Sequence, residues 1–204
     1  MPQVDTYTFK SPQLKDVLGG AVDFFLSRPF SVLPPDFRFN GPGVYGLYYS
    51  GNFELYEKLS QLNNSGHYLP IYIGKAVPPG WRTARIMSTD EQVLHRRLRE
   101  HVKSISRCSN LDVADFKCKF VILNGLESGL IVPLEAELIR KYTPLWNSIV
   151  DGFGNHDPGS GRYGQAKSEW DIVHPGRIWV DRLTGASPIQ DNVHSKIETY
   201  TKKL

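Results

Sequence analysis

Two short hydrophobic segments constrain the fold of this chain more than any other feature. Residues 43–49 (Gly-Val-Tyr-Gly-Leu-Tyr-Tyr) and residues 70–76 (Pro-Ile-Tyr-Ile-Gly-Lys-Ala) are rich in Tyr, Ile and Val and are bounded by Gly or Pro, which is typical of β-strands. In the connection between them, apolar residues recur about every three positions, at Phe53, Tyr56, Leu59 and Leu62. This spacing predicts a helix rather than a tight turn, and it leaves Tyr45 and Tyr72 on neighbouring strands.

Three further segments complete the predicted core. Residues 91–105 read as an amphipathic helix because an apolar residue returns every three or four positions, at Leu94, Leu98, Val102 and Ile105. Residues 117–123 alternate in the manner of a third strand. Residues 130–142 form a second predicted helix with Pro133 in its first turn, and Pro144 ends it.

Both ends of the chain carry helix signals. Ser11-Pro12 is a good helix start, and an apolar stripe at helical spacing follows it: Leu14, Val17, Leu18, Ala21, Phe24 and Phe25. We expect this helix to pack on the core. Near the other end, Ser168 and Pro175 look like the starts of two short helices, with Trp170, Ile178 and Trp179 as packing anchors.

Polar residues on the two core helices are candidates for chemistry. Arg97 and His101 lie four apart, so they project together from one flank of the apolar stripe toward the tyrosine strands. Glu135 falls on the buried side of the second helix. A buried carboxylate is costly unless it is paired or binds a metal. Glu135 is therefore either a metal ligand or the partner of Arg97 in a structural ion pair. Asn147, in Pro-Leu-Trp-Asn, is either a turn residue or a further polar contact.

Charge and composition set the outer limits. Residues 75–107 hold eight Lys or Arg against three Asp or Glu, in a chain whose net charge is +3. Such a basic zone suits a phosphate backbone, and the alternative is a solvated helix face. With 204 residues, 40% of them hydrophobic, we expect one domain comprising a helical arm (1–40), a core (41–150) and an extension (151–204).

The sequence also predicts where the protein works. No apolar run approaches the roughly 18 residues of a membrane span, and the first ten residues lack the layout of a secretory signal. Cys108 and Cys118 fit neither a disulfide framework nor a metal-site spacing, so both are expected to be reduced. We therefore expect a cytoplasmic protein.

The predicted order of strand, strand, helix, strand, helix and Pro-x-x-Asn resembles the GIY-YIG nuclease superfamily. Gly-Val-Tyr45 and Tyr72-Ile-Gly match its paired signature, with Val in place of the first Ile and a longer spacer than most members have. Segments at residues 132–136, 144–147, 151–156, 165–168 and 174–177 are similar to a small group of GIY-YIG type II restriction endonucleases that cut CCGCGG. The likeness extends from about Phe24 to Arg177. It implies an α+β fold with a small three-stranded antiparallel sheet flanked by helices, an N-terminal helix and a C-terminal extension.

The resemblance assigns a role to each candidate residue. Glu135 would hold one Mg²⁺, Arg97 would bind the scissile phosphate, and Asn147 would fix local geometry. Tyr45 would orient and deprotonate the attacking water, His101 would accept that proton, and Tyr72 would orient the phosphate or water. Which of Tyr45, Tyr72 and His101 is the general base stays open.

The resemblance also implies partners. Double-stranded DNA would be the substrate, a two-fold homodimer would match a palindromic site, and a methyltransferase would belong to the same system. Expected DNA-contacting residues are Lys75, Arg82, Arg96, Asn155, His156 and Arg162; Arg177 and Gln165 are further possible base readers. The alternatives are a GIY-YIG repair or homing nuclease and a non-catalytic DNA-binding domain.

Overall fold

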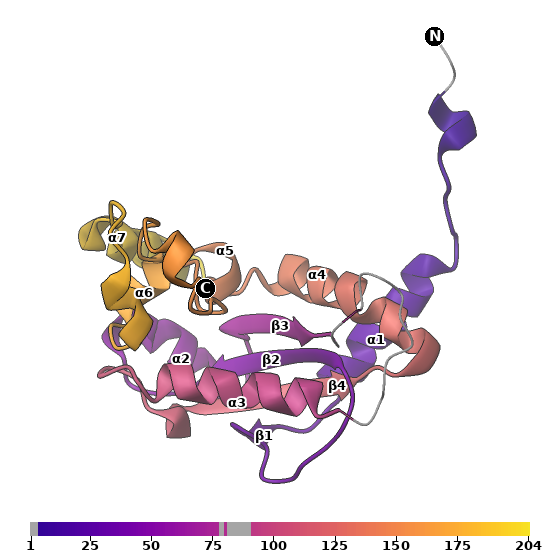
Figure 1. Cartoon of the computed structure of the whole chain (residues 1–204). Coiled ribbons are helices and arrows are strands. Elements are labelled where there is room, and N and C mark those ends of the chain that lie inside the picture. The colour runs from indigo at the N-terminus through magenta and orange to yellow at the C-terminus, as the bar shows by residue number, and fades with distance from the viewer. Residues whose placement is uncertain (1–3, 78–79, 81–90) are drawn as a thin grey trace.

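A four-stranded antiparallel sheet forms the centre of the computed structural model, which describes residues 4–77, 80 and 91–204 (Figure 1). The strand order is β1-β4-β2-β3. The bounds are Ser31–Val32 for β1, Gly43–Tyr49 for β2, Tyr72–Ala76 for β3 and Phe116–Ile122 for β4. Central strand β2 is buried along its whole length, whereas β3 is an edge strand.

The mixed helix and strand composition of the predicted fold is confirmed, but the prediction of three strands is wrong. The additional strand, β1, pairs with β4 through Ser31 opposite Cys118 and Val32 opposite Lys117. Two residues are too few to show the alternation that marks a strand in sequence. The neighbouring Pro29 and Pro34 made the segment look like a loop.

Helices cover both faces of the sheet. The α-helices run from Leu14–Leu26 (α1), Glu57–Asn64 (α2), Val93–Ile105 (α3), Ile131–Tyr142 (α4), Leu145–Ser148 (α5), Glu169–Val173 (α6) and Gln190–Thr201 (α7). Short 3₁₀ turns span Val4–Tyr7, Glu54–Tyr56, Val113–Asp115, Gly125–Leu130, Ser160–Arg162 and Ile178–Arg182. One apolar cluster joins α3 to the sheet face that carries Tyr45, and another joins α1 and α4 to the face that carries Val44.

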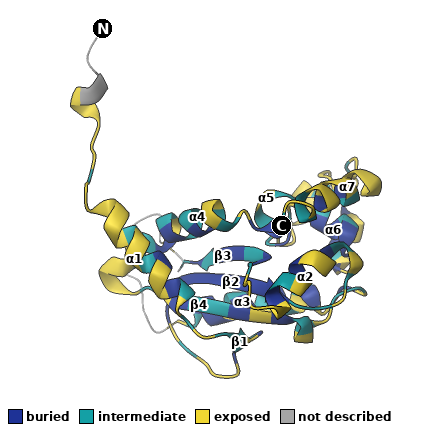
Figure 2. Cartoon of the chain, turned by 180° about the vertical axis from the view of Figure 1, so that it is seen from behind, coloured by how far each residue is buried: buried dark blue, intermediate teal, exposed yellow. Residues whose placement is uncertain are grey.

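Helix α1 is less buried than its apolar stripe predicts. Phe25 and Val22 are buried, but Leu14, Val17 and Phe24 keep about half of their surface exposed. We call these three side chains the α1 apolar surface. The segment before α1 extends away from the body of the molecule, and Tyr7 and Phe9 on it are almost fully exposed (Figures 1 and 2).

The C-terminal extension packs at one end of the sheet. Helix α6 starts after Ser168 as predicted, with the Ser168 side chain accepting from the Asp171 N–H, and Trp170 is fully buried. Ile178 is exposed, so it is not the anchor that the sequence suggested. Helix α7 was not predicted. Only Val193 and Ile197 of this helix are buried, so its sequence has a weak apolar pattern. Within the described residues, none of the helices has both the length and the apolar character needed to cross a membrane.

Candidate active site

The two signature tyrosines meet on one face of the β2–β3 pair. The register places Tyr45 opposite Gly74 and Tyr72 opposite Leu47. A Cβ at position 74 would overlap the Tyr45 hydroxyl, so glycine is what lets the Tyr45 ring lie across β3. The ring centroids of Tyr45 and Tyr72 are 6.2 Å apart.

His101 completes this aromatic group from α3. Its Nε2 lies 2.5 Å from the Tyr45 hydroxyl oxygen, and its ring stacks on Phe153 at 4.5 Å. Burial, followed by the charge of Arg97, holds the pKa of His101 well below its usual range. Burial, and then the neighbouring Tyr72, raises the pKa of Tyr45. A neutral imidazole therefore faces a neutral phenol, and the Tyr45 hydroxyl and His101 Nε2 share a hydrogen bond.

Arg97 is held in place on three sides. Its Nη1 donates to Glu100 (3.0 Å) and to His156 Nε2 (2.5 Å), and its Nη2 donates to the carbonyl of Gly154 (3.1 Å). A guanidinium has five N–H donors, so these bonds leave two for other partners. The charge and hydrogen bonding of Arg97 act on Tyr45, lowering its pKa against the larger effect of burial. The Arg97 guanidinium thus favours the ionised form of the Tyr45 phenol.

Glu135 pairs with Lys75, and not with Arg97. The Lys75 ammonium donates to the Glu135 carboxylate, whose side chain is 15% exposed. Lys75 is on edge strand β3, and Glu135 is on α4, which packs on the sheet face that carries Val44. Burial is the main reason that the pKa values of Tyr45 and Tyr72 are raised, and the Glu135 charge raises both further. The carboxylate charge therefore acts on both phenols across the β2–β3 pair.

The same residues suit a singly ligated divalent metal. The Lys75 ammonium lies against the Glu135 carboxylate, so this carboxylate is able to bind a cation. Over the described part of the chain, no group of three or more His, Cys, Asp or Glu is arranged to hold a metal ion. Mg²⁺ is often held by one or two carboxylates with water and phosphate oxygens. The donor set fits that mode and not an all-protein cage.

Asn147 fixes the edge strand that carries Tyr72. The Ile73 N–H donates to Asn147 Oδ1 (2.7 Å), and Asn147 Nδ2 donates to the Ile73 carbonyl (2.8 Å). Edge strands have unpaired backbone groups, and the Asn147 amide satisfies two of them as another strand would. Asn147 acts on the site through the backbone next to Tyr72.

A family model described as the Eco29kI GIY-YIG domain matches residues 37–201. This chain belongs to the Eco29kI GIY-YIG family of restriction endonucleases. The matched region contains all six candidate catalytic residues, from Tyr45 to Asn147. Comparison with curated proteins finds no significant match. As a member of a restriction endonuclease family, the chain is a GIY-YIG nuclease, and its substrate is DNA.

The residues expected to contact DNA in this GIY-YIG nuclease have different surroundings. Arg96 is exposed, with Nη2 3.9 Å from Glu91, and Asn155 and Arg162 are also exposed. His156 is exposed but contacts Arg97, which places it beside the tyrosines. Arg82 lies outside the described residues.

Arg177 is not a base reader, contrary to the sequence interpretation. Its side chain is only 1% exposed and forms a buried ion pair with Asp171 (2.6 Å). A guanidinium enclosed in this way cannot reach a base edge. Gln165 is exposed and stays available for such a contact.

Sequence reasoning missed that residues 152–156 fold back onto the GIY-YIG site. Phe153 stacks on His101, and a Cβ at position 154 would lie 2.9 Å from the Tyr72 hydroxyl and 3.3 Å from Arg97 Nη2. The glycines of this stretch were the available signal, because glycine allows the backbone to approach a side chain closely.

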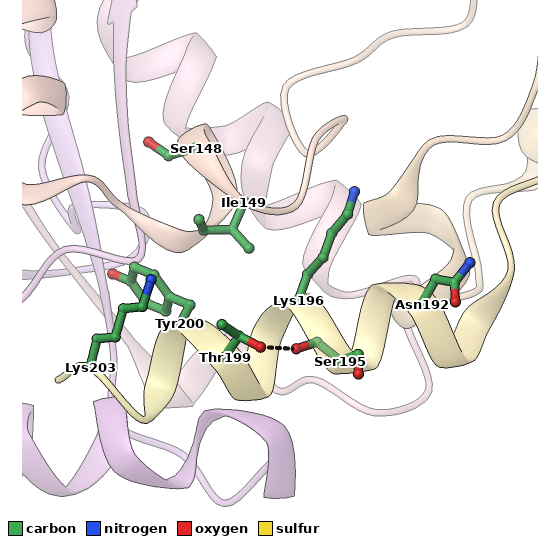
Figure 3. A pocket seen from close by; sticks show the side chains of 8 residues that line it. All are labelled: Ser148, Ile149, Asn192, Ser195, Lys196, Thr199, Tyr200 and Lys203. Atoms are coloured by element: carbon green, nitrogen blue, oxygen red, sulfur yellow. Dashed lines mark hydrogen bonds between the residues drawn. The ribbon is translucent and has the colours of Figure 1, made fainter.

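A cavity of about 510 Å³ between α5 and α7 is separate from the GIY-YIG site (Figure 3). Its lining residues are Ser148, Ile149, Asn192, Ser195, Lys196, Thr199, Tyr200 and Lys203. No candidate catalytic side chain lines it. DNA is an extended substrate, so the nuclease site is expected on an open surface and not in this cavity.

Proposed function

We propose that this GIY-YIG nuclease is a type II restriction endonuclease that hydrolyses phosphodiester bonds of double-stranded DNA at CCGCGG, with one Mg²⁺ per active site. The observation that carries the proposal is the 2.5 Å contact between Tyr45 and His101, with Tyr72, Arg97 and Glu135 around it. Hydrolysis needs removal of a proton from water and positive charge at the phosphate. The group contains candidates for both.

Tyr45 and His101 form a proton relay in this proposal. A buried phenol with a raised pKa is not ionised at rest, so Tyr45 by itself is a poor base. When its oxygen takes a proton from water, its own proton moves along the existing hydrogen bond to His101 Nε2. The lowered pKa of His101 keeps that nitrogen free to accept. The transient imidazolium then returns the proton to solvent or to the leaving oxygen.

Arg97 and Glu135 supply the charges. Arg97 has two N–H donors beyond those that bond Glu100, His156 and Gly154, and a guanidinium presents its donors in a fork that suits phosphate oxygens. Glu135 would hold Mg²⁺, displacing Lys75. When bound, the metal supplies positive charge that stabilises the pentacoordinate phosphate. Lys75, once released, would turn toward a DNA phosphate.

A palindromic target with one site per chain calls for a two-fold homodimer. The α1 apolar surface supports this proposal, because several exposed apolar side chains on one helix are typical of contact surfaces. We propose that a second copy covers it. Sedimentation should detect a dimer on cognate DNA, and Val17→Glu with Phe24→Glu should weaken it. A wild-type monomer bound to cognate DNA contradicts this part.

A methyltransferase acting on the same sequence would protect host DNA.

Cleavage of DNA with Mg²⁺ tests the main proposal. Discrete fragments ending at CCGCGG support it, whereas nicks at branched substrates indicate a repair nuclease and binding without cleavage indicates a non-catalytic domain. Glu135→Gln should bind the site and fail to cut. Glu137→Gln is the matched control on the same helix, since Glu137 pairs with Arg140 at the surface. Single base-pair changes in the duplex, each expected to cost about 1–3 kcal/mol in affinity, test the sequence preference.

A further inference from the structure

The C-terminal extension contains a buried arginine whose contacts lead to the active site. The Arg177 guanidinium lies between the rings of Trp170 (4.7 Å) and Trp179 (4.9 Å). Its Nε donates to Asp171, which also accepts from the Ser168 hydroxyl (2.6 Å). Buried ion pairs are costly unless fully hydrogen-bonded, and they are more often retained for specificity than for stability. This pair therefore calls for an explanation beyond the fold.

Three of the other donors of Arg177 go to the 152–156 loop. Nη2 donates to the carbonyl of Gly152 (3.0 Å), and Nη1 donates to those of Phe153 (3.2 Å) and Asn155 (3.1 Å). With the bond to Asp171, four of the five N–H groups are used. Gly152 has φ of +101°, and a Cβ there would overlap Ser168, so the loop has this shape only with glycine at that position.

The opposite side of the same loop contacts the groups proposed to react. The Gly154 carbonyl accepts from Arg97 Nη2, and the His156 ring accepts from Arg97 Nη1. Phe153 stacks on His101 and keeps water from its ring. Arg177 thus binds three carbonyls of a loop whose other groups fix both Arg97 and His101.

We propose that Arg177 is a positioning residue for the nuclease reaction, because it holds the 152–156 loop in the shape that orients Arg97 and shields His101. The proposal rests on the proposed function and deepens it. Arg177 touches neither Tyr45 nor the phosphate in this arrangement, and it acts through the loop. A misplacement of about 1 Å in a catalytic group costs about 100-fold in rate. A loosened loop should therefore lower the rate without weakening DNA binding.

Arg177→Lys is the decisive variant, because it keeps the charge and loses the planar fork and the stacking. We expect single-turnover cleavage of a CCGCGG duplex to fall by roughly 10- to 100-fold. The dissociation constant for the same duplex in Ca²⁺, measured by fluorescence anisotropy, should stay within twofold. Lys196→Met is the matched control: it breaks the exposed Lys196–Glu169 pair between α6 and α7 and should leave both quantities unchanged.

An NMR titration of His101 in the free protein gives a readout independent of cleavage. His101 has Tyr45, Arg97 and His156 as its titratable or charged neighbours. Burial lowers the pKa of His101 most, and the charges of Arg97, His156 and Arg177 lower it further, in that order. Charge alone predicts no change in Arg177→Lys, whereas loosening of the loop admits water and raises the His101 pKa. Arg177→Lys that cuts at the wild-type rate, or that slows cleavage without moving the His101 pKa, overturns the proposal.

Gly154→Ala keeps the proposal testable if the Arg177 variants do not fold. The added methyl meets Tyr72 and Arg97 without touching the buried ion pair. We expect a folded protein with unchanged thermal unfolding and at least tenfold slower cleavage, and a wild-type rate overturns the proposal. If the wild-type protein cuts no DNA, the proposed function fails, while the His101 titration still decides whether Arg177 holds the loop.

Discussion

The ammonium of Lys75 lies against the carboxylate of Glu135, across the gap between edge strand β3 and helix α4. In the proposed mechanism this contact occurs where Mg²⁺ would bind. The ammonium and the metal therefore compete for one carboxylate. The consequence is a metal affinity lower than Glu135 by itself would give.

We predict that Lys75→Met binds Mg²⁺ about tenfold more tightly, which corresponds to about 1.4 kcal/mol. Isothermal titration of the free protein measures this affinity without reference to cleavage. Lys119→Met is the control, because Lys119 donates to the Leu26 carbonyl and has no carboxylate partner among the described residues. Equal or weaker Mg²⁺ binding by Lys75→Met would show that Lys75 does not compete with the metal.

A second Tyr–His pair in the same chain provides a comparison for Tyr45 and His101. The Tyr56 O–H donates to His174 Nε2 (2.6 Å), and Trp146 Nε1 donates to the Tyr56 oxygen (3.0 Å). His174 Nδ1 donates to Asn110 (2.9 Å), so every member of this network has a partner. Both tyrosines are fully buried, but only Tyr45 has Arg97 and the Glu135 charge beside it.

We predict opposite effects for the two hydroxyl deletions. Tyr45→Phe should lower the single-turnover cleavage rate by about 10²- to 10⁴-fold, since it interrupts the relay. Tyr56→Phe should leave the rate within a fewfold and lower the free energy of unfolding by about 1–3 kcal/mol, because it leaves Trp146 and His174 unpaired. Cleavage kinetics and urea unfolding of both variants separate the two roles. Undiminished cleavage by Tyr45→Phe would remove Tyr45 as the base.

Periodicity in the sequence was sufficient to predict the central elements. Strands β2, β3 and β4 and helices α3 and α4 begin and end within a few residues of the predicted bounds, because their apolar residues repeat with the period of one structure. The helical spacing of Arg97 and His101 also predicted that both face the tyrosine strands. Local pattern and tertiary packing agree at these positions.

The remaining features depend on contacts between distant segments. Glu135 was expected to pair with Arg97 if it paired at all, but Lys75 lies closer, across the edge of the sheet. Arg177 looked like a surface residue because nothing in its local sequence reveals that Trp170 and Trp179 enclose it. Burial of a charged side chain is decided by its tertiary partners, and the local pattern carries no trace of them.

Two buried histidines should make the protein sensitive to mild acid. Burial lowers the pKa of His174 to about 3, and burial followed by the Arg97 charge lowers that of His101. In the unfolded chain both imidazoles have the ordinary pKa near about 6.5. Below that pH the unfolded state binds more protons than the folded state, so stability is complete above it and is lost as the pH falls.

We predict that the free energy of unfolding falls by about 2.4 kcal/mol between about pH 7 and pH 5.5, from roughly 1.2 kcal/mol per histidine. Urea unfolding at several pH values measures the slope. His174→Gln should remove about half of it, because glutamine does not titrate in this range. An identical slope in His174→Gln would show that His174 does not contribute.

Two asparagines bind backbone peptide groups in the same way at different places. Asn147 pairs with the N–H and the carbonyl of Ile73, beside Tyr72. Asn63 pairs with the N–H (2.7 Å) and the carbonyl (3.1 Å) of Leu69, before β3 begins, and it also donates to the Tyr49 carbonyl (2.7 Å). Removal of either side chain should cost similar stability, and only Asn147 lies next to a residue proposed to touch the phosphate.

We predict that Asn147→Ala and Asn63→Ala each lower the free energy of unfolding by about 1–3 kcal/mol, since each leaves backbone groups unpaired. Cleavage should fall about 10- to 100-fold in Asn147→Ala and stay within a fewfold in Asn63→Ala, because only the first releases the backbone next to Tyr72. Asn147→Asp sharpens the test: one oxygen still accepts from the Ile73 N–H, but the other faces the Ile73 carbonyl, so two acceptors repel each other. It should therefore be no better than Asn147→Ala. If Asn63→Ala slows cleavage as much as Asn147→Ala does, the loss follows general stability and Asn147 has no specific role in positioning Tyr72.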